Sequence, residues 1–137
     1  MQIDEGTLRT FSESLKRCNG SPAFVKRFYE IFLASSPKVK EKFGQTDFVR
    51  QREALRASLD AMLLAAKDPQ DGPARHLHDL AERHSSRQLN IGAELYDLWL
   101  DSLLTAVKEF DPISGPEVQE AWEKVMMVGV SYLLSRY

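Results

Sequence analysis

Prolines divide this chain into segments of helical length. Four of the six occur at Ser21-Pro22, Ser36-Pro37, Gly72-Pro73 and Gly115-Pro116. Proline is favoured in the first turn of a helix, because its missing N–H would have no partner there in any case. Within the segments, apolar residues recur at spacings of three and four, and we find no alternating strand pattern, hairpin turn or internal repeat. The sequence therefore predicts an all-α fold.

These breaks predict six or seven helices. Asn19-Gly20 ends the first segment, and Thr46-Asp47 offers N-cap residues before the fourth. The expected helices span residues 5–18, 22–34, 37–43, 48–67, 73–86, 93–110 and 116–134. A chain of 137 residues can bury one core without disulfides, so we expect a single domain over residues 1–137.

Charge and cysteine content exclude several classes of protein. Cys18 is the only cysteine, which excludes an internal disulfide and a zinc site built on paired cysteines. The net charge is −2, with basic and acidic residues interspersed, which argues against nucleic-acid and membrane partners. The first residues do not form a hydrophobic signal, and no apolar run approaches the roughly 18 residues of a membrane span. We therefore expect a cytoplasmic protein.

A histidine lies on the apolar face of the predicted helix 73–86. Leu77, Leu80, Ala81 and His84 are spaced i, i+3, i+4 and i+7, so the imidazole points where the leucines point. Burying either imidazole nitrogen without a partner costs about 1–3 kcal/mol. A metal, a backbone carbonyl or a buried hydroxyl would each provide that partner, and this residue alone does not decide between them.

Two more polar residues lie on or beside apolar helix faces. Gln51 lies between Phe48 and Leu55 on the stripe of helix 48–67, where its amide needs either buried partners or access to water at the rim. Tyr29 lies at the edge of the apolar arc of helix 22–34, so its hydroxyl points either into a pocket or toward solvent.

Taken in order along the chain, these features resemble the globin family, and specifically its bacterial single-domain and flavohaemoglobin branch. The matching blocks are Phe28-Tyr29, 37–43, 51–55, 80–84, Ile91 with 94–96, 103–104, and Ala121-Trp122. The spacing from Phe43 to Gln51 to His84 also fits. The resemblance covers nearly the whole chain. It implies a globin fold, a three-over-three helical sandwich around a haem pocket.

The resemblance also implies a b-type haem and a role for each unexplained polar residue. His84 would be the proximal ligand of the iron through Nε2, with its other ring nitrogen bonded to a carbonyl or a hydroxyl. Tyr29 and Gln51 would lie on the distal side and stabilise bound O₂, with Leu55 above the iron. The further cofactor contacts would be Phe43, Leu80, Arg83, Arg87, Ile91 and Tyr96. Of these, Phe43 would pack on the haem face, and the two arginines are either partners of the haem propionates or plain surface cations.

Three features depart from the family pattern. The chain is two residues longer between His84 and Tyr96, which puts the contact of Tyr96 with the proximal histidine in question. Lys124 falls where we expect the family's acidic residue, so we expect the hydrogen-bonded Tyr–Glu pair to be missing or rebuilt. From the end of the chain at Tyr137 we expect no flavin, nicotinamide or signalling domain.

Several other residues are expected to be structural or solvated. His78 falls on the polar side of its helix and His76 beside the apolar stripe, and neither is favoured as an iron ligand. Cys18 carries no motif and is interpreted as structural. Trp99 is expected to pack between helices rather than contact a ligand.

Reversible binding of O₂, and also of NO and CO, is the function that these residues favour, as in oxygen transport or storage. One alternative is an NO dioxygenase that receives its electrons from a separate reductase. A second alternative is a haem-based gas sensor that acts through a partner protein. A third is a globin fold that does not bind haem. The sequence leaves the oligomeric state open between a monomer and a homodimer, and fold alone does not decide among these functions.

Overall fold

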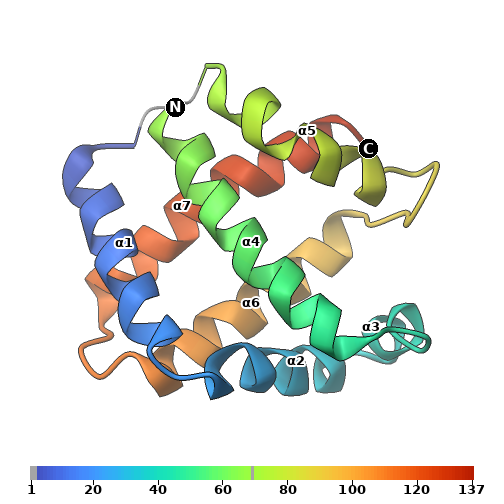
Figure 1. Ribbon diagram of the computed structural model, residues 1–137, viewed down its shortest axis with the longest axis horizontal. Coiled ribbons are helices and arrows are strands. Elements are labelled where there is room, and N and C mark those ends of the chain that lie inside the picture. The colour runs from blue at the N-terminus through green and yellow to red at the C-terminus, as the bar shows by residue number, and fades with distance from the viewer. Residues whose placement is uncertain (1–2, 69) are drawn as a thin grey trace.

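The computed structural model describes residues 3–68 and 70–137, which form seven helices (Figure 1). They are α1 (Glu5–Asn19), α2 (Ala23–Ser35), α3 (Pro37–Lys42), α4 (Phe48–Lys67), α5 (Gly72–His84), α6 (Ala93–Phe110) and α7 (Pro116–Ser135). Each expected helix is present, and its ends differ from the predicted ones by at most two residues. The largest difference is at α5, which ends at His84 because Ser85 has an extended backbone.

Side chains at the helix starts explain why the boundaries could be predicted. The Asp47 carboxylate accepts hydrogen bonds from the backbone N–H groups of Val49 and Arg50 at the start of α4. Asp4 caps α1 in the same way, at 2.7 Å from the N–H of Thr7. Proline occupies the first turn of α3, α5 and α7. Each of these residues satisfies or removes a backbone donor that a helix start leaves free.

The helices pack in pairs that enclose one core. α2 lies mainly against α6, and α4 lies mainly against α5, while α7 contacts α1, α4, α5 and α6. Figure 1 shows α4 crossing in front of α7 near the middle of the molecule. The turn between α4 and α5 requires a glycine, because a Cβ at Gly72 would lie 2.6 Å from the Ala65 carbonyl oxygen. Among the described residues, no helix is long and apolar enough to cross a membrane.

A polar network is buried where α1, α7 and the end of α6 meet. Asp111 accepts hydrogen bonds from the hydroxyl of Ser14 at 2.6 Å and from two guanidinium nitrogens of Arg17 at 2.7 and 2.9 Å. The backbone N–H of Ile113 also donates to Asp111, and the Trp122 indole N–H donates to the Ser14 hydroxyl oxygen at 2.8 Å. The network joins residues more than 90 positions apart in the sequence. It therefore ties the N-terminal helix to the C-terminal half of the fold.

Candidate functional site

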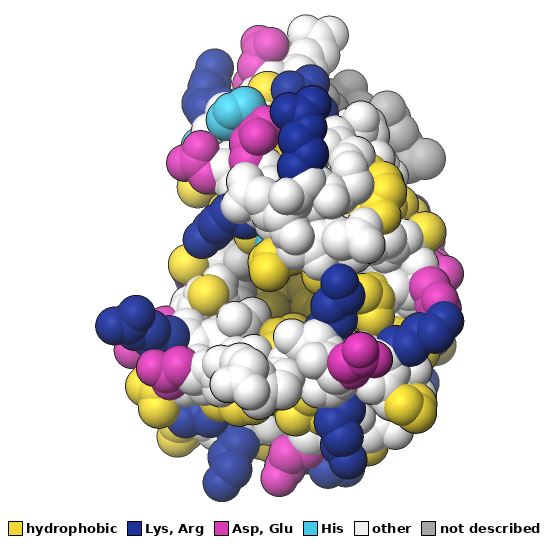
Figure 2. Space-filling model, turned by 90° about the vertical axis from the view of Figure 1, so that its right-hand side faces the viewer, with side chains coloured by type: hydrophobic (Ala, Val, Ile, Leu, Met, Phe, Trp, Pro, Cys, Tyr) yellow, Lys and Arg dark blue, Asp and Glu magenta, His cyan; other side chains and the backbone are white. Residues whose placement is uncertain are grey.

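A cavity of about 190 Å³ lies between α2, α4, α5 and α6. Figure 2 shows a hollow with hydrophobic side chains at its base on the right-hand side of the molecule as drawn in Figure 1. A single water needs only about 10–15 Å³ on the same measure, and packed interiors have few voids larger than that. The space is therefore too large to be a packing defect, and it could hold a ligand. All the predicted site residues except Arg87 line it, namely Tyr29, Phe43, Gln51, Leu55, Leu80, Arg83, His84, Ile91 and Tyr96.

His84 is the last residue of α5, and its ring is held by the preceding turn of that helix. Nδ1 lies 2.8 Å from the carbonyl oxygen of Leu80. A carbonyl can only accept, so Nδ1 carries the proton and Nε2 keeps its lone pair. Burial lowers the pKa of His84, and the charge of Arg83 lowers it further, although the Leu80 hydrogen bond opposes both effects. The site therefore holds a neutral imidazole, and among the described residues no hydrogen bond reaches its Nε2.

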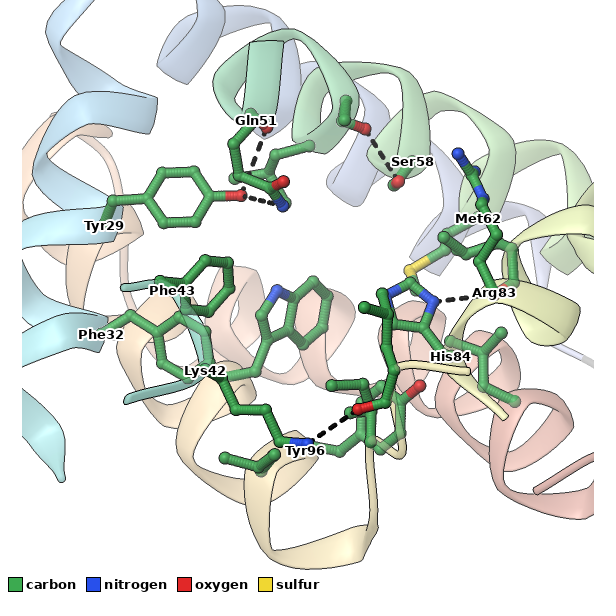
Figure 3. A pocket seen from close by; sticks show the side chains of 18 residues that line it. Tyr29, Phe32, Lys42, Phe43, Gln51, Ser58, Met62, Arg83, His84 and Tyr96 are labelled. Carbon is green, nitrogen blue, oxygen red and sulfur yellow. Dashed lines mark hydrogen bonds between the residues drawn. The ribbon is translucent and has the colours of Figure 1, made fainter. Parts of the chain in front are cut away.

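Tyr29 and Gln51 face the cavity from the side opposite His84 (Figure 3). Tyr29 is buried, so its hydroxyl points into the pocket and not to solvent. Nε2 of Gln51 donates to the Tyr29 hydroxyl oxygen at 3.1 Å, and that hydroxyl donates to the Gln51 backbone carbonyl at 3.3 Å. Burial raises the pKa of Tyr29 to about 12, against the opposing effect of the Gln51 hydrogen bond. The phenol is therefore a neutral hydrogen-bond donor at physiological pH.

Tyr96 lies on the same side of the cavity as His84, with the two ring centroids 6.4 Å apart. Its hydroxyl is buried and has no hydrogen-bond partner among the described residues. Burial raises the pKa of this phenol. The residue of α7 that lines the cavity is Leu133, whereas Lys124 is exposed and pairs with Glu120 at 2.8 Å. Lys124 therefore does not stand in for an acidic partner of Tyr96.

Apolar side chains form most of the remaining wall. Leu55 is buried one turn beyond Gln51 on α4, while Leu80 and Ile91 are partly buried. Phe43 packs edge-on against Tyr29 and Phe32, at centroid distances of 5.9 and 5.7 Å. Edge-on packing at these distances is an arrangement that aromatic pairs favour.

Two cations lie at the cavity, and one of them was missed in the sequence. Arg83, a predicted cofactor contact, is exposed and lines the cavity. Lys42 lines it from the end of α3, where its Nζ donates to the Leu89 carbonyl at 2.8 Å. No local pattern marks Lys42, because its position depends on how the segment after α5 folds back. Arg87 belongs to that segment, and its exposed side chain does not line the cavity.

The structure also brings in residues that were given other roles or none. Trp99, which was expected to pack between helices rather than contact a ligand, packs edge-on against Phe28 at 6.3 Å and also lines the cavity. His76 and His78 are exposed, and neither lines the cavity. Cys18 is buried in α1 away from the cavity. The further lining residues that were not predicted are Phe32, Ala54, Ser58, Met62, Leu89, Leu95 and Leu133.

A comparison with known families shows which family this chain belongs to. The sequence model of the family described as Globin matches residues 26–133, which is most of the chain. The chain belongs to the globin family. The predicted all-α globin fold is therefore confirmed, and family membership makes this a haem-binding globin.

Two relatives agree with this assignment. A flavohemoprotein of Oceanobacillus iheyensis is 32% identical over 116 residues, covering 82% of this globin. The chain spans 28% of that protein's length. The second is a crystal structure of a Pseudomonas aeruginosa PAO1 protein described as structurally highly homologous to a human hemoglobin. The two structures superpose with a TM-score of 0.90, and their sequences are 39% identical. The superposition covers 96% of this chain and 98% of the Pseudomonas chain. The resemblance to bacterial globins is thus confirmed in both sequence and structure.

The residues at the cavity fit a haem. The unprotonated Nε2 of His84 is the donor atom that haem iron takes from a histidine. The apolar walls suit the porphyrin ring, and Lys42 and Arg83 suit its carboxylates. The hydroxyl of Tyr96 is a buried polar group without a partner among the described residues, which a bound molecule or water would supply.

Proposed function

We propose that this globin binds O₂ reversibly, and also NO and CO, in the cavity between His84 and the Tyr29–Gln51 pair. The observation that carries the proposal is that different polar groups face each other across the cavity. A neutral imidazole lies on one side, and two neutral hydrogen-bond donors lie on the other. Such donors stabilise a ligand that gains negative charge on binding. They therefore favour O₂ over a ligand that stays uncharged.

A bound haem supplies an iron ion with a position for a diatomic gas. His84 would hold the iron through Nε2, while Leu80 fixes the ring through Nδ1. Phe43, Leu55 and Ile91 would pack on the porphyrin, and Lys42 and Arg83 would pair with its carboxylates. The proposed haem is of type b and not of type c, because the thioether links of a c-type haem require cysteines and the chain's single cysteine is buried outside the cavity.

The distal donors can turn toward a ligand at low cost. The Tyr29 hydroxyl lies 3.3 Å from the Gln51 carbonyl, which is long for a hydrogen bond between oxygens. Rotating the O–H toward the cavity therefore gives up a weak interaction. Gln51 can keep one N–H on the Tyr29 oxygen and present the other to the ligand, because an amide carries two.

The dissociation rate of O₂ tests this role of Tyr29. We expect Tyr29→Phe to release O₂ about ten to a hundred times faster, since a hydrogen bond to a charged ligand contributes roughly 1.5–3 kcal/mol. Stopped-flow mixing of the O₂ complex with excess CO measures this rate. Ser58→Ala is the matched control, because the Ser58 hydroxyl also lies at the cavity but donates to the Ala54 carbonyl. Equal rates in wild type and Tyr29→Phe would contradict the proposal.

A second candidate is oxidation of NO to nitrate with O₂, with electrons from a separate reductase. The similarity of this chain to a flavohemoprotein favours this candidate. NO consumption measured with a reductase and NADH separates the two functions. Sustained turnover supports the enzyme, whereas consumption that stops after one equivalent supports reversible binding alone.

A further inference from the structure

Gly129 lies inside α7 at the point where this helix meets α4. A Cβ placed on Gly129 would lie 3.0 Å from Cγ, 3.1 Å from Cε and 3.2 Å from Sδ of Met62. Favourable contacts between carbon atoms have separations of about 3.5–4.0 Å. Met62 therefore rests directly on the backbone of α7, in space that any side chain at position 129 would take.

The free space next to Met62 is the cavity. Its side chain is 2% exposed, so packed residues separate it from solvent. It also lines the cavity, where Figure 3 shows its thioether on the same side as His84. A flexible thioether adapts to the space that it is given. Displaced from α7, the Met62 side chain would enter the cavity.

Glycine is an unfavourable residue inside a helix when only stability matters. It loses more backbone entropy on folding than alanine does. Gly129 is buried within a 20-residue helix. Its presence there is explained by the room that it leaves for Met62.

We propose that Gly129 is a positioning residue for the cofactor. By letting Met62 lie back against α7, it keeps this part of the cavity open for haem. Gly129 itself does not line the cavity, and it acts through the side chain that does. The inference rests on the haem-binding role and adds a determinant of how large a ligand the cavity accepts.

The substitution Gly129→Ala tests this by separating stability from binding. In the haem-free protein the displaced Met62 has the empty cavity to enter, so the urea midpoint stays equal or rises, as helix propensity predicts. In the haemin-loaded protein the same side chain competes with the cofactor. We expect haemin transfer to an excess of an acceptor globin to be at least about fivefold faster than in wild type, because overpacking costs of this kind correspond to such factors.

Rescue and control variants assign the effect to Met62. Gly129→Ala combined with Met62→Ala removes the colliding side chain, and we expect haemin retention to return to that of Met62→Ala alone. Gly6→Ala is the matched control, since Gly6 is an exposed helical glycine in α1, remote from the cavity lining. Unchanged haemin transfer in Gly129→Ala, or no recovery in the double variant, overturns the inference.

Binding of a fluorescent dye to the haem-free protein tests the role of Gly129 without using haem. Anilinonaphthalene sulfonate combines an apolar ring system with a negative charge, so it suits an apolar cavity with Lys42 and Arg83 at its edge. We expect Gly129→Ala to weaken its binding to the haem-free protein, and Met62→Ala to restore it. If wild type fails to bind haemin, the proposed function fails. If the dye binds wild type and Gly129→Ala equally, the role of Gly129 fails.

Discussion

Two groups of polar side chains in the interior of this globin differ in whether their hydrogen bonds are complete. In the network around Asp111, the carboxylate, the Ser14 hydroxyl and the Trp122 indole all have partners at 2.6–3.0 Å. At the cavity, the Tyr96 hydroxyl has no partner among the described residues, and His84 uses one of its two nitrogens. Polar groups are seldom buried without partners unless they serve a function. The complete network therefore acts as a clamp between helices, and the incomplete group is a binding site.

The largest expected change in unfolding free energy comes from a substitution that breaks the clamp and does not alter the cavity lining. Asp111→Ala leaves Ser14 and Arg17 without their acceptor, and removing one member of a buried pair costs about 3–5 kcal/mol. Arg17 is 26% exposed and can regain water, so we expect a loss near the lower limit, about 3 kcal/mol of unfolding free energy. Urea unfolding measures it. Asp101→Ala, which removes a carboxylate at an exposed position of α6, is the matched control.

Under conditions in which Asp111→Ala is still folded, we expect it to bind as much haemin per chain as wild type, since Asp111 does not line the cavity. A variant that keeps its stability but loses haemin would contradict the division into clamp and site.

Acid is expected to weaken the same clamp. Burial alone would raise the pKa of Asp111, but hydrogen bonds from Arg17 and Ser14 outweigh it and hold the pKa below its usual range. The carboxylate is thus more acidic folded than unfolded, so its contribution is present above the unfolded pKa, about 4, and is lost as pH falls through the folded pKa. We expect the difference in unfolding free energy between wild type and Asp111→Asn to shrink below pH 4. A difference that stays constant from pH 7 to pH 3 would show that Asp111 is not held as an anion.

The smallest expected changes in unfolding free energy come from the two tyrosines at the cavity, and the two changes have opposite signs. Tyr96→Phe removes a buried hydroxyl without a partner among the described residues, so we expect the haem-free protein to gain about 1–2 kcal/mol. Tyr29→Phe removes a hydroxyl that accepts and donates hydrogen bonds, so we expect a loss of about 1 kcal/mol. Urea midpoints of the two variants measure both. Equal losses in both would mean that the Tyr96 hydroxyl is satisfied in solution.

Local sequence patterns were sufficient for the helices and for the centre of the site. Prolines and aspartates at helix starts act within one turn, so their effects are visible in the sequence. His84 and Gln51 stood out because each interrupts an apolar stripe, and the structure brings both to one cavity. The globin resemblance proposes one reason for both interruptions, a haem bound between them.

Residues whose roles depend on distant partners could not be predicted in this way. Asp111 meets Ser14 across 97 positions, and no local pattern at either residue announces the pairing. Lys42 lies at the cavity, where it donates a hydrogen bond to the Leu89 carbonyl in the loop after α5. Trp99 lies on a face of α6 that contacts both the core and the cavity. The contact of Met62 with Gly129 depends on where α7 crosses α4.

The most direct test of the central claim is the absorption spectrum of the purified protein, compared with His84→Ala. It is recorded as isolated, after reduction with dithionite, and then with O₂ and with CO. We predict an intense Soret band that shifts with CO in wild type and is lost or altered in His84→Ala. A protein that stays colourless after haemin is added, or a variant whose spectra match those of wild type, would contradict the assignment of this cavity and of His84.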